Sequence, residues 1–142
     1  MVKQISIFLE NRKGRLAYVC KILGEAEINI RALSIADTTD FGVLRLIVND
    51  PDKAYEILTA KGLVTQITDV LAIEVSDTPG ALGLALEKLD QAGISVEYMY
   101  AFLGSISKDA LVIIRVENPE EAIDVIKKAG INVLDGERVY AL

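Results

Sequence analysis

The sequence contains no histidine and only one cysteine, Cys20. Without histidine, the commonest general base and a frequent zinc ligand are both missing. No glycine-rich phosphate loop, cofactor-binding lysine motif or metal-ligand cluster appears either. We therefore expect no catalytic residues, no metal and no cofactor. A single cysteine allows no disulfide within the chain, and we expect Cys20 to lie buried on the apolar side of the first helix.

Long apolar runs are also missing, because none approaches the ~20 residues of a membrane span. The chain begins directly with an alternating strand pattern and has no apolar signal core, so we expect a cytoplasmic protein without membrane contact. The net charge of −6 argues against a nucleic-acid partner. The excess acid lies entirely in residues 70–142, since residues 1–69 carry no net charge.

The most informative stretch joins an alternating apolar run at residues 4–9 to an amphipathic run at residues 15–27. This pattern predicts a strand, a tight polar turn and the start of a helix. Gly14 supplies the backbone freedom that the turn needs. The first amides of the helix have no partner inside it, so they form a seat for an anion such as a carboxylate. Arg12, Lys13 and Arg15 surround that seat with positive charge.

The same pattern recurs around Gly80, followed by Leu82 as Gly14 is followed by Leu16. The two helix starts Asp50-Pro51 and Asn118-Pro119 also correspond, with a polar cap followed by proline. Each half of the chain therefore has the order β-α-β-β-α-β. The predicted strands cover 4–9, 28–36, 42–48, 63–68, 70–75, 97–102 and 110–116, with further strand residues near Val133 and Val139; the predicted helices cover 15–27, 51–61, 80–92 and a run from 119.

This order predicts an α+β protein of two tandem ferredoxin-like domains, residues 1–69 and 70–142. We expect each domain to have an antiparallel sheet with its helices on one face. No proline- or glycine-rich linker separates the domains, because residues 68–70 pass directly from one predicted strand into the next. Apolar strand content exceeds what two helices per domain can cover, so we also expect the chain to form a homodimer.

The repeated motif resembles the ACT domain, the small regulatory module of amino-acid metabolism. The first copy carries Glu10-Asn11-Arg12-x-Gly14-x-Leu16 and later Ile28-Asn29-Ile30. The second copy carries Asp77-x-Pro79-Gly80-x-Leu82 and Ile94-Ser95-Val96. The resemblance covers both repeats and is greatest to stand-alone tandem ACT proteins that have no enzyme domain attached.

This resemblance implies that a free amino acid binds where the first loop of one domain faces the second strand of another. Asn11 and Asn29 match the two asparagines that hold the ligand in the serine-binding type, although Leu9 and Lys13 replace a histidine and a proline of that type. The expected contacts of the ligand in the first loop are Asn11, Arg12, Lys13, Gly14, Arg15 and Leu16. Turn formation alone is the alternative role for the two asparagines, and a solvated charged face is the alternative for the three cations.

The second loop is the weaker candidate for a binding site. It consists of Asp77, Thr78, Pro79, Gly80, Ala81 and Leu82. Asp77 would repel a carboxylate, although it could accept a hydrogen bond from an ammonium group. Tyr98 and Tyr100 share one face of their strand, where they either pack between domains or close the ligand pocket.

Two functions of different classes remain at this stage. The first is a non-enzymatic regulatory protein that binds an amino acid and signals to a regulated enzyme. The second is a structural oligomerisation module without any small-molecule ligand. Stabilisation by an amino acid would distinguish them.

Overall fold

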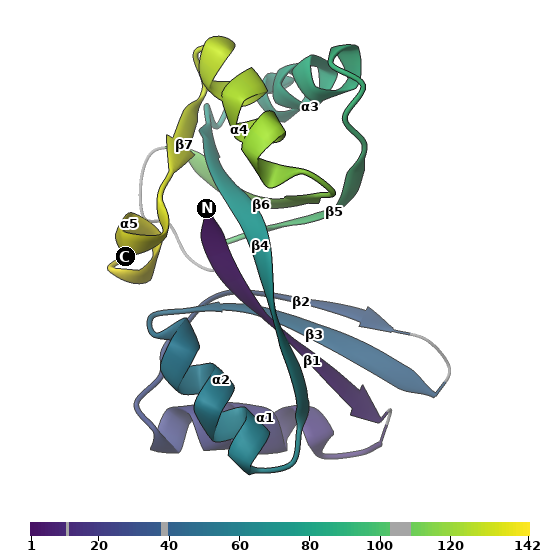
Figure 1. Cartoon of the computed structure of the whole chain (residues 1–142), viewed down its shortest axis with the longest axis vertical. Coiled ribbons are helices and arrows are strands. Elements are labelled where there is room, and N and C mark those ends of the chain that lie inside the picture. Colours follow the sequence, from purple (N-terminus) through teal and green to yellow (C-terminus); the bar gives the residue numbers. More distant parts are fainter. Residues whose placement is uncertain (11, 38–39, 103–108) are drawn as a thin grey trace. The chain divides into compact units, whose positions relative to one another are not determined.

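The structure is a computed structural model of the chain, and it describes all residues except 11, 38–39 and 103–108 (Figure 1). The described chain divides into two compact units. One unit comprises Lys3–Thr68, and the other comprises Asp69–Leu142 together with Met1–Val2. Each unit is described by itself below.

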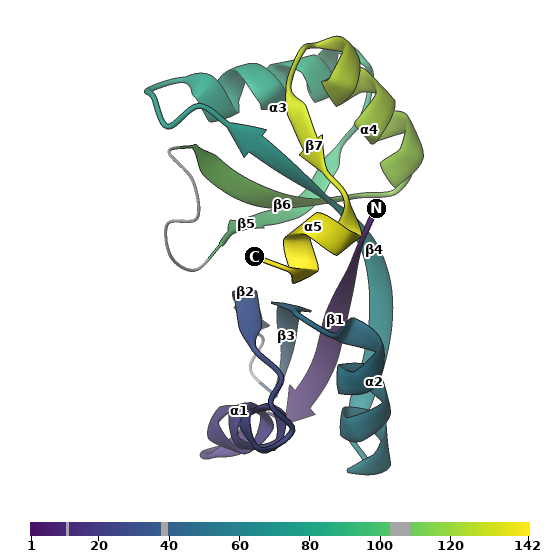
Figure 2. The same cartoon turned by 90° about the vertical axis from the view of Figure 1, so that its left-hand side faces the viewer.

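The unit Lys3–Thr68 places its strands in the order β2-β3-β1-β4, with β3 antiparallel to both β1 and β2. Two helices cover one face of this sheet, and their apolar residues pack with Ile5, Ile7, Leu44 and Leu46 in one core (Figure 2). The elements are β1 Val2–Glu10, α1 Arg15–Glu25, β2 Ile30–Asp37, β3 Phe41–Val48, α2 Pro51–Ala60 and β4 Val64–Val75.

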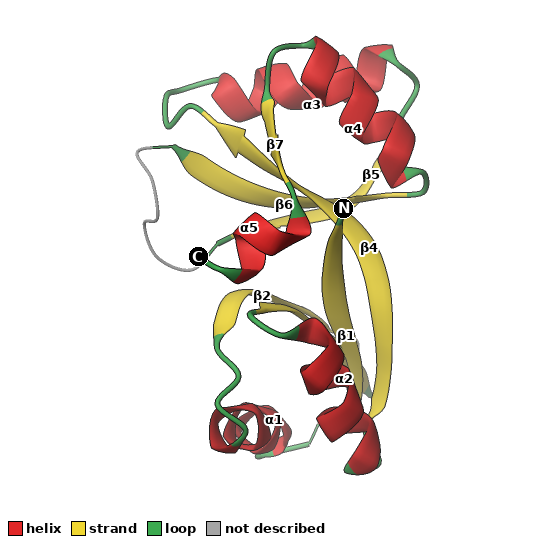
Figure 3. Cartoon of the chain, turned by 60° about the vertical axis from the view of Figure 1, so that its left-hand side comes forward, coloured by secondary structure: helices red, strands yellow, loops and turns green. Residues whose placement is uncertain are grey.

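The second unit has the equivalent strand order, β7-β4-β6-β5, and β4 pairs antiparallel with β6 and β7, as β5 does with β6. Its core joins Leu71, Ile73, Val112 and Ile114 of the sheet to apolar residues of two helices (Figure 3). The elements after β4 are α3 Ala81–Gln91, β5 Val96–Ala101, β6 Ala110–Val116, α4 Pro119–Lys128, β7 Asn132–Leu134 and α5 Gly136–Tyr140.

The prediction of two ferredoxin-like β-α-β-β-α-β units is therefore confirmed. The strand β4 is the difference from the sequence-based expectation, because it is continuous where two strands were predicted. Its first residues, up to Thr68, complete the first unit, and its later residues open the second. No proline or glycine interrupts residues 64–75, so nothing in the local sequence ends the strand.

The two loops before α1 and α3 have nearly the same backbone geometry. Gly14 has φ 86° and ψ −6°, and Gly80 has φ 86° and ψ −10°. Both residues are left-handed N-caps without a side-chain cap hydrogen bond. Glycine adopts this conformation without the steric cost that a Cβ atom would add.

The predicted caps of α2 and α4 are confirmed. The Asp50 carboxylate accepts from the Lys53 amide at 3.2 Å, and the Asn118 side chain accepts from the Glu121 amide at 3.4 Å. Proline follows each cap, at the position where its missing N–H costs no helical hydrogen bond.

Two sequence-based expectations were wrong. Val139 lies in α5, not in a strand, because Asp135 caps a short helix by accepting from the Arg138 amide at 2.9 Å. Cys20 is exposed, not buried, since the core-facing side of α1 is formed by Val19, Ile22 and Leu23. Periodicity alone could not separate these neighbouring positions on one helix.

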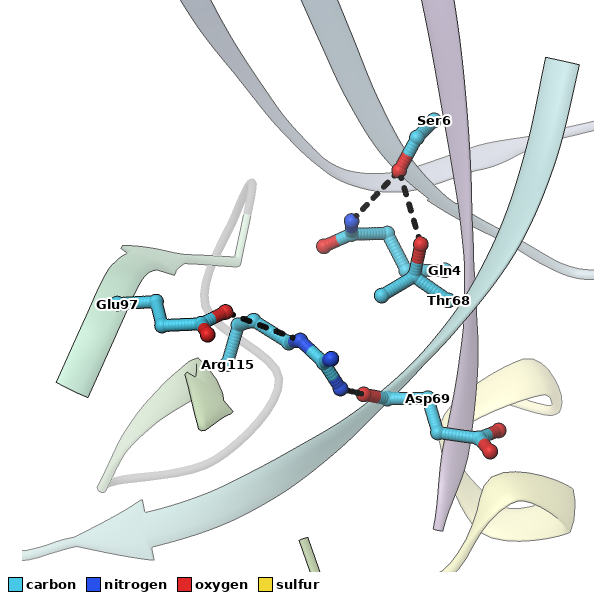
Figure 4. A network of polar contacts seen from close by, with 6 residues as sticks. All are labelled: Gln4, Ser6, Thr68, Asp69, Glu97 and Arg115. Atoms are coloured by element: carbon cyan, nitrogen blue, oxygen red, sulfur yellow. Dashed lines mark hydrogen bonds and ion pairs between the residues drawn. The ribbon is translucent and has the colours of Figure 1, made fainter. Parts of the chain in front are cut away.

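Polar groups are satisfied locally on the strands of each unit (Figure 4). In the first unit, the buried Gln4 Nε2 donates to Ser6 Oγ at 2.9 Å, and Ser6 Oγ lies 3.3 Å from Thr68 Oγ1. In the second unit, Arg115 donates to the Asp69 carbonyl at 2.8 Å and to Glu97 at 3.2 Å. Each contact removes the cost of leaving a polar group unpaired on a half-buried sheet.

The C-termini of α1 and α3 end in the same hydrogen-bonded turn, but with different residues at its left-handed position. Ile28 donates to the Leu23 carbonyl at 2.9 Å, as Ile94 donates to the Leu89 carbonyl at 2.9 Å. The left-handed residue is Glu27 in the first turn, with φ 59°, and Gly93 in the second, with φ 75°. Glu27 therefore carries a steric cost that Gly93 avoids.

Replacing Glu27 by glycine is expected to stabilise the protein by about 1 kcal/mol, because the strain of a Cβ at positive φ is removed. Urea unfolding measures the change as a shift of the midpoint at constant slope. Glu27→Ala is the matched control, since it removes the charge but keeps the Cβ. Equal stabilisation by alanine and glycine would show that charge, not backbone strain, is responsible.

Removing the side-chain cap of α2 with Asp50→Ala is expected to lower the free energy of unfolding by about 1 kcal/mol, because the Lys53 amide loses its acceptor. Asp50→Asn, which keeps an acceptor oxygen, should lose much less. A similar loss in both variants would point to charge instead of capping.

Candidate functional site

The first loop and the helix that follows it border a small hollow in the unit Lys3–Thr68. Its volume is about 100 Å³. Three of the residues expected to contact a ligand border it, namely Arg12, Arg15 and Leu16. The other residues that line the hollow are Leu9, Glu10, Ile35, Asp37, Gly42 and Leu44. Asn11 lies outside the described residues.

The hollow forms because β3 lies between β1 and β2 and runs antiparallel to both. β1 and β2 therefore run parallel, and their last residues lie at the same end of the sheet. Glu10 pairs with Phe41, and Asp37 pairs with Gly42. Sequence reasoning missed Ile35 and Asp37, although the predicted β-α-β-β order implies this proximity.

Gly42 keeps part of the hollow open. It pairs with Leu9 on one side and with Asp37 on the other, and all three border the hollow. A Cβ added at Gly42 would lie 3.6 Å from Asp37 Oδ1, which is an ordinary contact. A longer side chain would instead extend into the space between Leu9 and Asp37.

The N-terminus of α1 is electropositive. No acidic residue lies in its first turn, whereas α2 has Asp52 there. Among the described residues, no acceptor satisfies the amides of Leu16 and Ala17, while the Arg15 amide donates to the Arg12 carbonyl at 3.3 Å. Free amides, the helix dipole and a cationic side chain together favour an anion at this end of the helix.

The two arginines of the hollow differ in their surroundings. Arg12 Nε lies 2.9 Å from Glu10 Oε2, and both side chains are largely exposed. Arg15 Nε is buried without a hydrogen-bond partner among the described residues, and the Arg15 guanidinium lies 5.7 Å from the centre of the Tyr18 ring. Since a buried donor without an acceptor is costly, Arg15 is the group here that would gain most from an anionic ligand.

Lys13 and Asn29 lie apart from this arrangement. Lys13 is exposed and does not border the hollow. The Asn29 amide donates to Asn49 Oδ1 at 2.8 Å, just beyond the end of β3 that is opposite Gly42. Seven residues of strand separate the two ends, a distance of about 23 Å. Within one unit, Asn29 therefore does not reach the first loop.

The second loop, residues 77–82, contains no arginine or lysine, unlike the first loop. Asp77 is exposed, and Thr78 Oγ1 donates to Ser76 Oγ at 3.2 Å. Pro79 and Gly80 are exposed, and Leu82 is half-buried against the core of the unit. Ala81 borders a different hollow, between α3 and the segment before β7.

Tyr98 and Tyr100 lie on β5 in the second unit. Their rings are stacked, with centroids 6.5 Å apart and planes inclined by 20°. This contact confirms that the two side chains share one face of the strand, as the alternation predicted.

Two further observations concern metal binding and membrane-spanning helices. Among the described residues, no group of three or more Cys, Asp or Glu side chains is placed to hold a metal ion. Within the same residues, no helix has both the length and the apolar character needed to cross a membrane.

Comparison with solved structures finds a similar protein of nearly equal length. Protein BT0572 from Bacteroides thetaiotaomicron is 43% identical, with a TM-score of 0.92, and the match covers 99% of this chain and 96% of that one. The regulatory subunit of aspartate kinase from Thermus thermophilus, in its ligand-free form, is 20% identical with a TM-score of 0.63. That match covers 89% of this chain and 91% of the other, and at this identity it shows a shared fold.

The corresponding subunit from Thermus flavus is 17% identical, with a TM-score of 0.62 and coverage of 90% and 92%. No curated protein matches the chain. The family described as an ACT domain pair matches residues 1–142, which is the whole sequence. The chain therefore belongs to the family of ACT domain pairs.

Proposed function

We propose that this protein is a non-enzymatic regulator that binds a free amino acid at the hollow beside the first loop and signals to an enzyme of amino-acid metabolism. The observation that carries the proposal is the buried Arg15 Nε at the edge of the hollow, which has no hydrogen-bond acceptor within the part of the chain that the structure describes. Membership of the ACT domain pairs supports the same class of function.

The carboxylate of the ligand would accept hydrogen bonds from Arg15 Nε and from the amides of Leu16 and Ala17. Each of these donors would gain an acceptor that none of the described residues supplies, and a charged acceptor makes the bonds stronger. The ligand's ammonium group would lie toward Glu10 and Asp37, the two carboxylates at the hollow. The hollow thus has both cationic and anionic groups at its border, which suits a zwitterion.

The remaining walls of the hollow are apolar and would contact the ligand's side chain. They consist of Leu9, Leu16, Ile35 and Leu44. The volume of about 100 Å³ is well below that of a usual ligand pocket, which is about 300 Å³ or more. A second segment must therefore complete the site, and Asn29, Tyr98 and Tyr100 from another domain or chain are our candidates.

Signalling follows if the ligand joins two segments that move relative to each other when it is absent. Binding then favours one arrangement over others, and an enzyme that contacts only that arrangement responds to the amino acid. Two solved structures of similar fold are described as regulatory subunits of aspartate kinase. A kinase of this kind is therefore the partner that we would test first.

A thermal-shift screen against the twenty amino acids should identify a ligand that raises the melting temperature. At one hundred times its Kd, a ligand that binds only the folded protein stabilises it by about 2.7 kcal/mol. Arg15→Gln should remove most of this stabilisation, because the carboxylate loses its charged donor. Asn11→Ala is expected to do the same.

Lys13→Gln is the matched control for Arg15→Gln. It removes one positive charge from the same turn, but Lys13 does not border the hollow, so the shift should persist. Asp77→Ala should likewise have little effect. If no amino acid changes the melting temperature, the structural oligomerisation module becomes the better reading; equal losses from Arg15→Gln and Lys13→Gln would refute the specific contact.

Filling the hollow tests the same site without changing any charge. Gly42→Leu should leave the protein folded, because a Cβ at this position makes only ordinary contacts, but its longer side chain should exclude the ligand. We expect the ligand-induced thermal shift to fall by most of its value. Gly42→Ala should retain a larger part of the thermal shift than Gly42→Leu. An undiminished shift in the leucine variant would show that the ligand binds elsewhere.

A further inference from the structure

A second and larger hollow lies within the unit that begins at Asp69. Its volume is about 460 Å³, inside the range of about 300–1,000 Å³ that is usual for small-molecule sites. It is lined by the end of β4, by one side of α3 and by the turn that leads into β7. The first hollow is lined instead by residues of β2, whose counterpart β5 lies at the other end of the sheet from β7. The two hollows are therefore not equivalent positions of the repeated fold.

Part of the lining is apolar and exposed. Ala81 and Leu84 lie three residues apart on α3, so they share one side of the helix, and Val75 and Ile131 line the hollow from the sheet. Leu84 is 62% exposed, although it is a large apolar residue. An apolar molecule in the hollow would remove this surface from water, which is favourable.

Two carboxylates border the same hollow at the end of β4. Glu74 lies on β4, and Asp109 directly precedes the β6 residue that pairs with Val75. Glu74 is half-buried, and its side chain has no hydrogen bond or ion pair within the part of the chain that the structure describes. Lys88 of α3 is exposed and forms no ion pair there either, so it does not neutralise Glu74. The carboxylate of Glu74 would therefore gain from a cationic partner in the hollow.

The helix positions that line the hollow hold larger residues in the first unit. At the offset of 66 residues that relates the two loops, Ala81 and Leu84 correspond to Arg15 and Tyr18. The Arg15 guanidinium lies 5.7 Å from the centre of the Tyr18 ring, so these two side chains cover that side of α1. The smaller residues of α3 leave the corresponding surface uncovered.

The strand positions differ in charge as well as in size. By the strand registers, Glu74 corresponds to Phe8, and Asp109 corresponds to Phe41. Two aromatic residues of the first unit are thus carboxylates in the second. The differences between the units that gather at this hollow give it free space, an apolar wall and negative charge.

We propose that this hollow binds a small molecule that combines an apolar body with a primary ammonium group. The ammonium group donates to Glu74 and lies near Asp109, and the apolar body contacts Leu84 and Ile131. An anion is disfavoured, because the two carboxylates outnumber Lys88 and because residues 70–142 carry all of the chain's excess acid. This site goes beyond the proposed amino-acid site and does not depend on it.

Titration of the ¹⁵N-labelled protein with phenethylamine measures the binding. Phenethyl alcohol and hydrocinnamate are the matched probes, since they join the same ring to a neutral or an anionic end. The Leu84 and Asn132 amides should show saturable shifts with phenethylamine, and its dissociation constant should be about tenfold below that of the alcohol, because a charged donor strengthens a hydrogen bond to a carboxylate. Hydrocinnamate should bind more weakly than the alcohol. Methylamine, which lacks the apolar body, should bind more weakly than phenethylamine.

Variants of the lining test the two contacts separately. Glu74→Gln should raise the dissociation constant of phenethylamine about tenfold and leave that of phenethyl alcohol nearly unchanged. Glu87→Gln is the matched control, because it removes the same charge from an exposed residue of α3 that does not line the hollow. Leu84→Ser should weaken both the amine and the alcohol. Its exposure means that this change leaves the core intact.

The proposal is overturned if phenethylamine gives no saturable shift at Leu84 and Asn132, or if it binds no more tightly than the alcohol and hydrocinnamate. Equal weakening by Glu74→Gln and Glu87→Gln would also overturn it. Arg15→Gln should leave the binding of phenethylamine unchanged, because Arg15 belongs to the first unit. Failure of this site is thereby distinguished from failure of the proposed amino-acid site.

Discussion

The antiparallel pairing of β3 with both β1 and β2 is the constraint on which the candidate site depends. It brings the carboxyl ends of β1 and β2 to one end of the sheet, so Glu10 and Asp37 lie opposite Phe41 and Gly42, which are neighbours in β3. The turn at Gly14 then directs α1 back over the sheet, with its positive end at that edge. Strand order and one left-handed turn thus assemble two carboxylates, an arginine and free amides in a small space.

The groups that would bind an anion at the first loop lower the stability of the unliganded protein. Arg15 stands at the positive end of a helix dipole, and its buried Nε has no acceptor among the described residues. Both features cost free energy in the unliganded protein. Helix α4 of the same chain begins differently, since the Asn118 side chain accepts from the Glu121 amide and two glutamates lie in the first turn. An anion bound at α1 would remove the cost that the first loop carries.

Much of the fold could be predicted from the sequence because its turns and helix starts are set by local residues. Gly14 and Gly80 mark left-handed turns, and Asp50 and Asn118 mark capped helices, wherever the rest of the chain lies. The apolar periodicity did not reveal the continuity of β4 or the helix at Val139, although residues 64–75 contain no proline or glycine and Asp135 caps that helix. For the site, the cations of the loop were visible in the sequence. The strand register was needed to show that Ile35, Asp37 and Gly42 lie beside them. The placement of Asn29 at the far end of β3 likewise required the register to be known.

The most direct test of the account is a titration of the ¹⁵N-labelled protein with each of the twenty amino acids, followed by the backbone amide resonances. For the amino acid that binds, the account predicts saturable shifts that are largest for the amides of Leu16 and Ala17, because these would donate to the ligand's carboxylate. Residues that border the hollow, including Gly42, should shift with the same saturation curve. The absence of saturable shifts with all twenty amino acids, or shifts centred on the loop at Gly80, would contradict the proposed site.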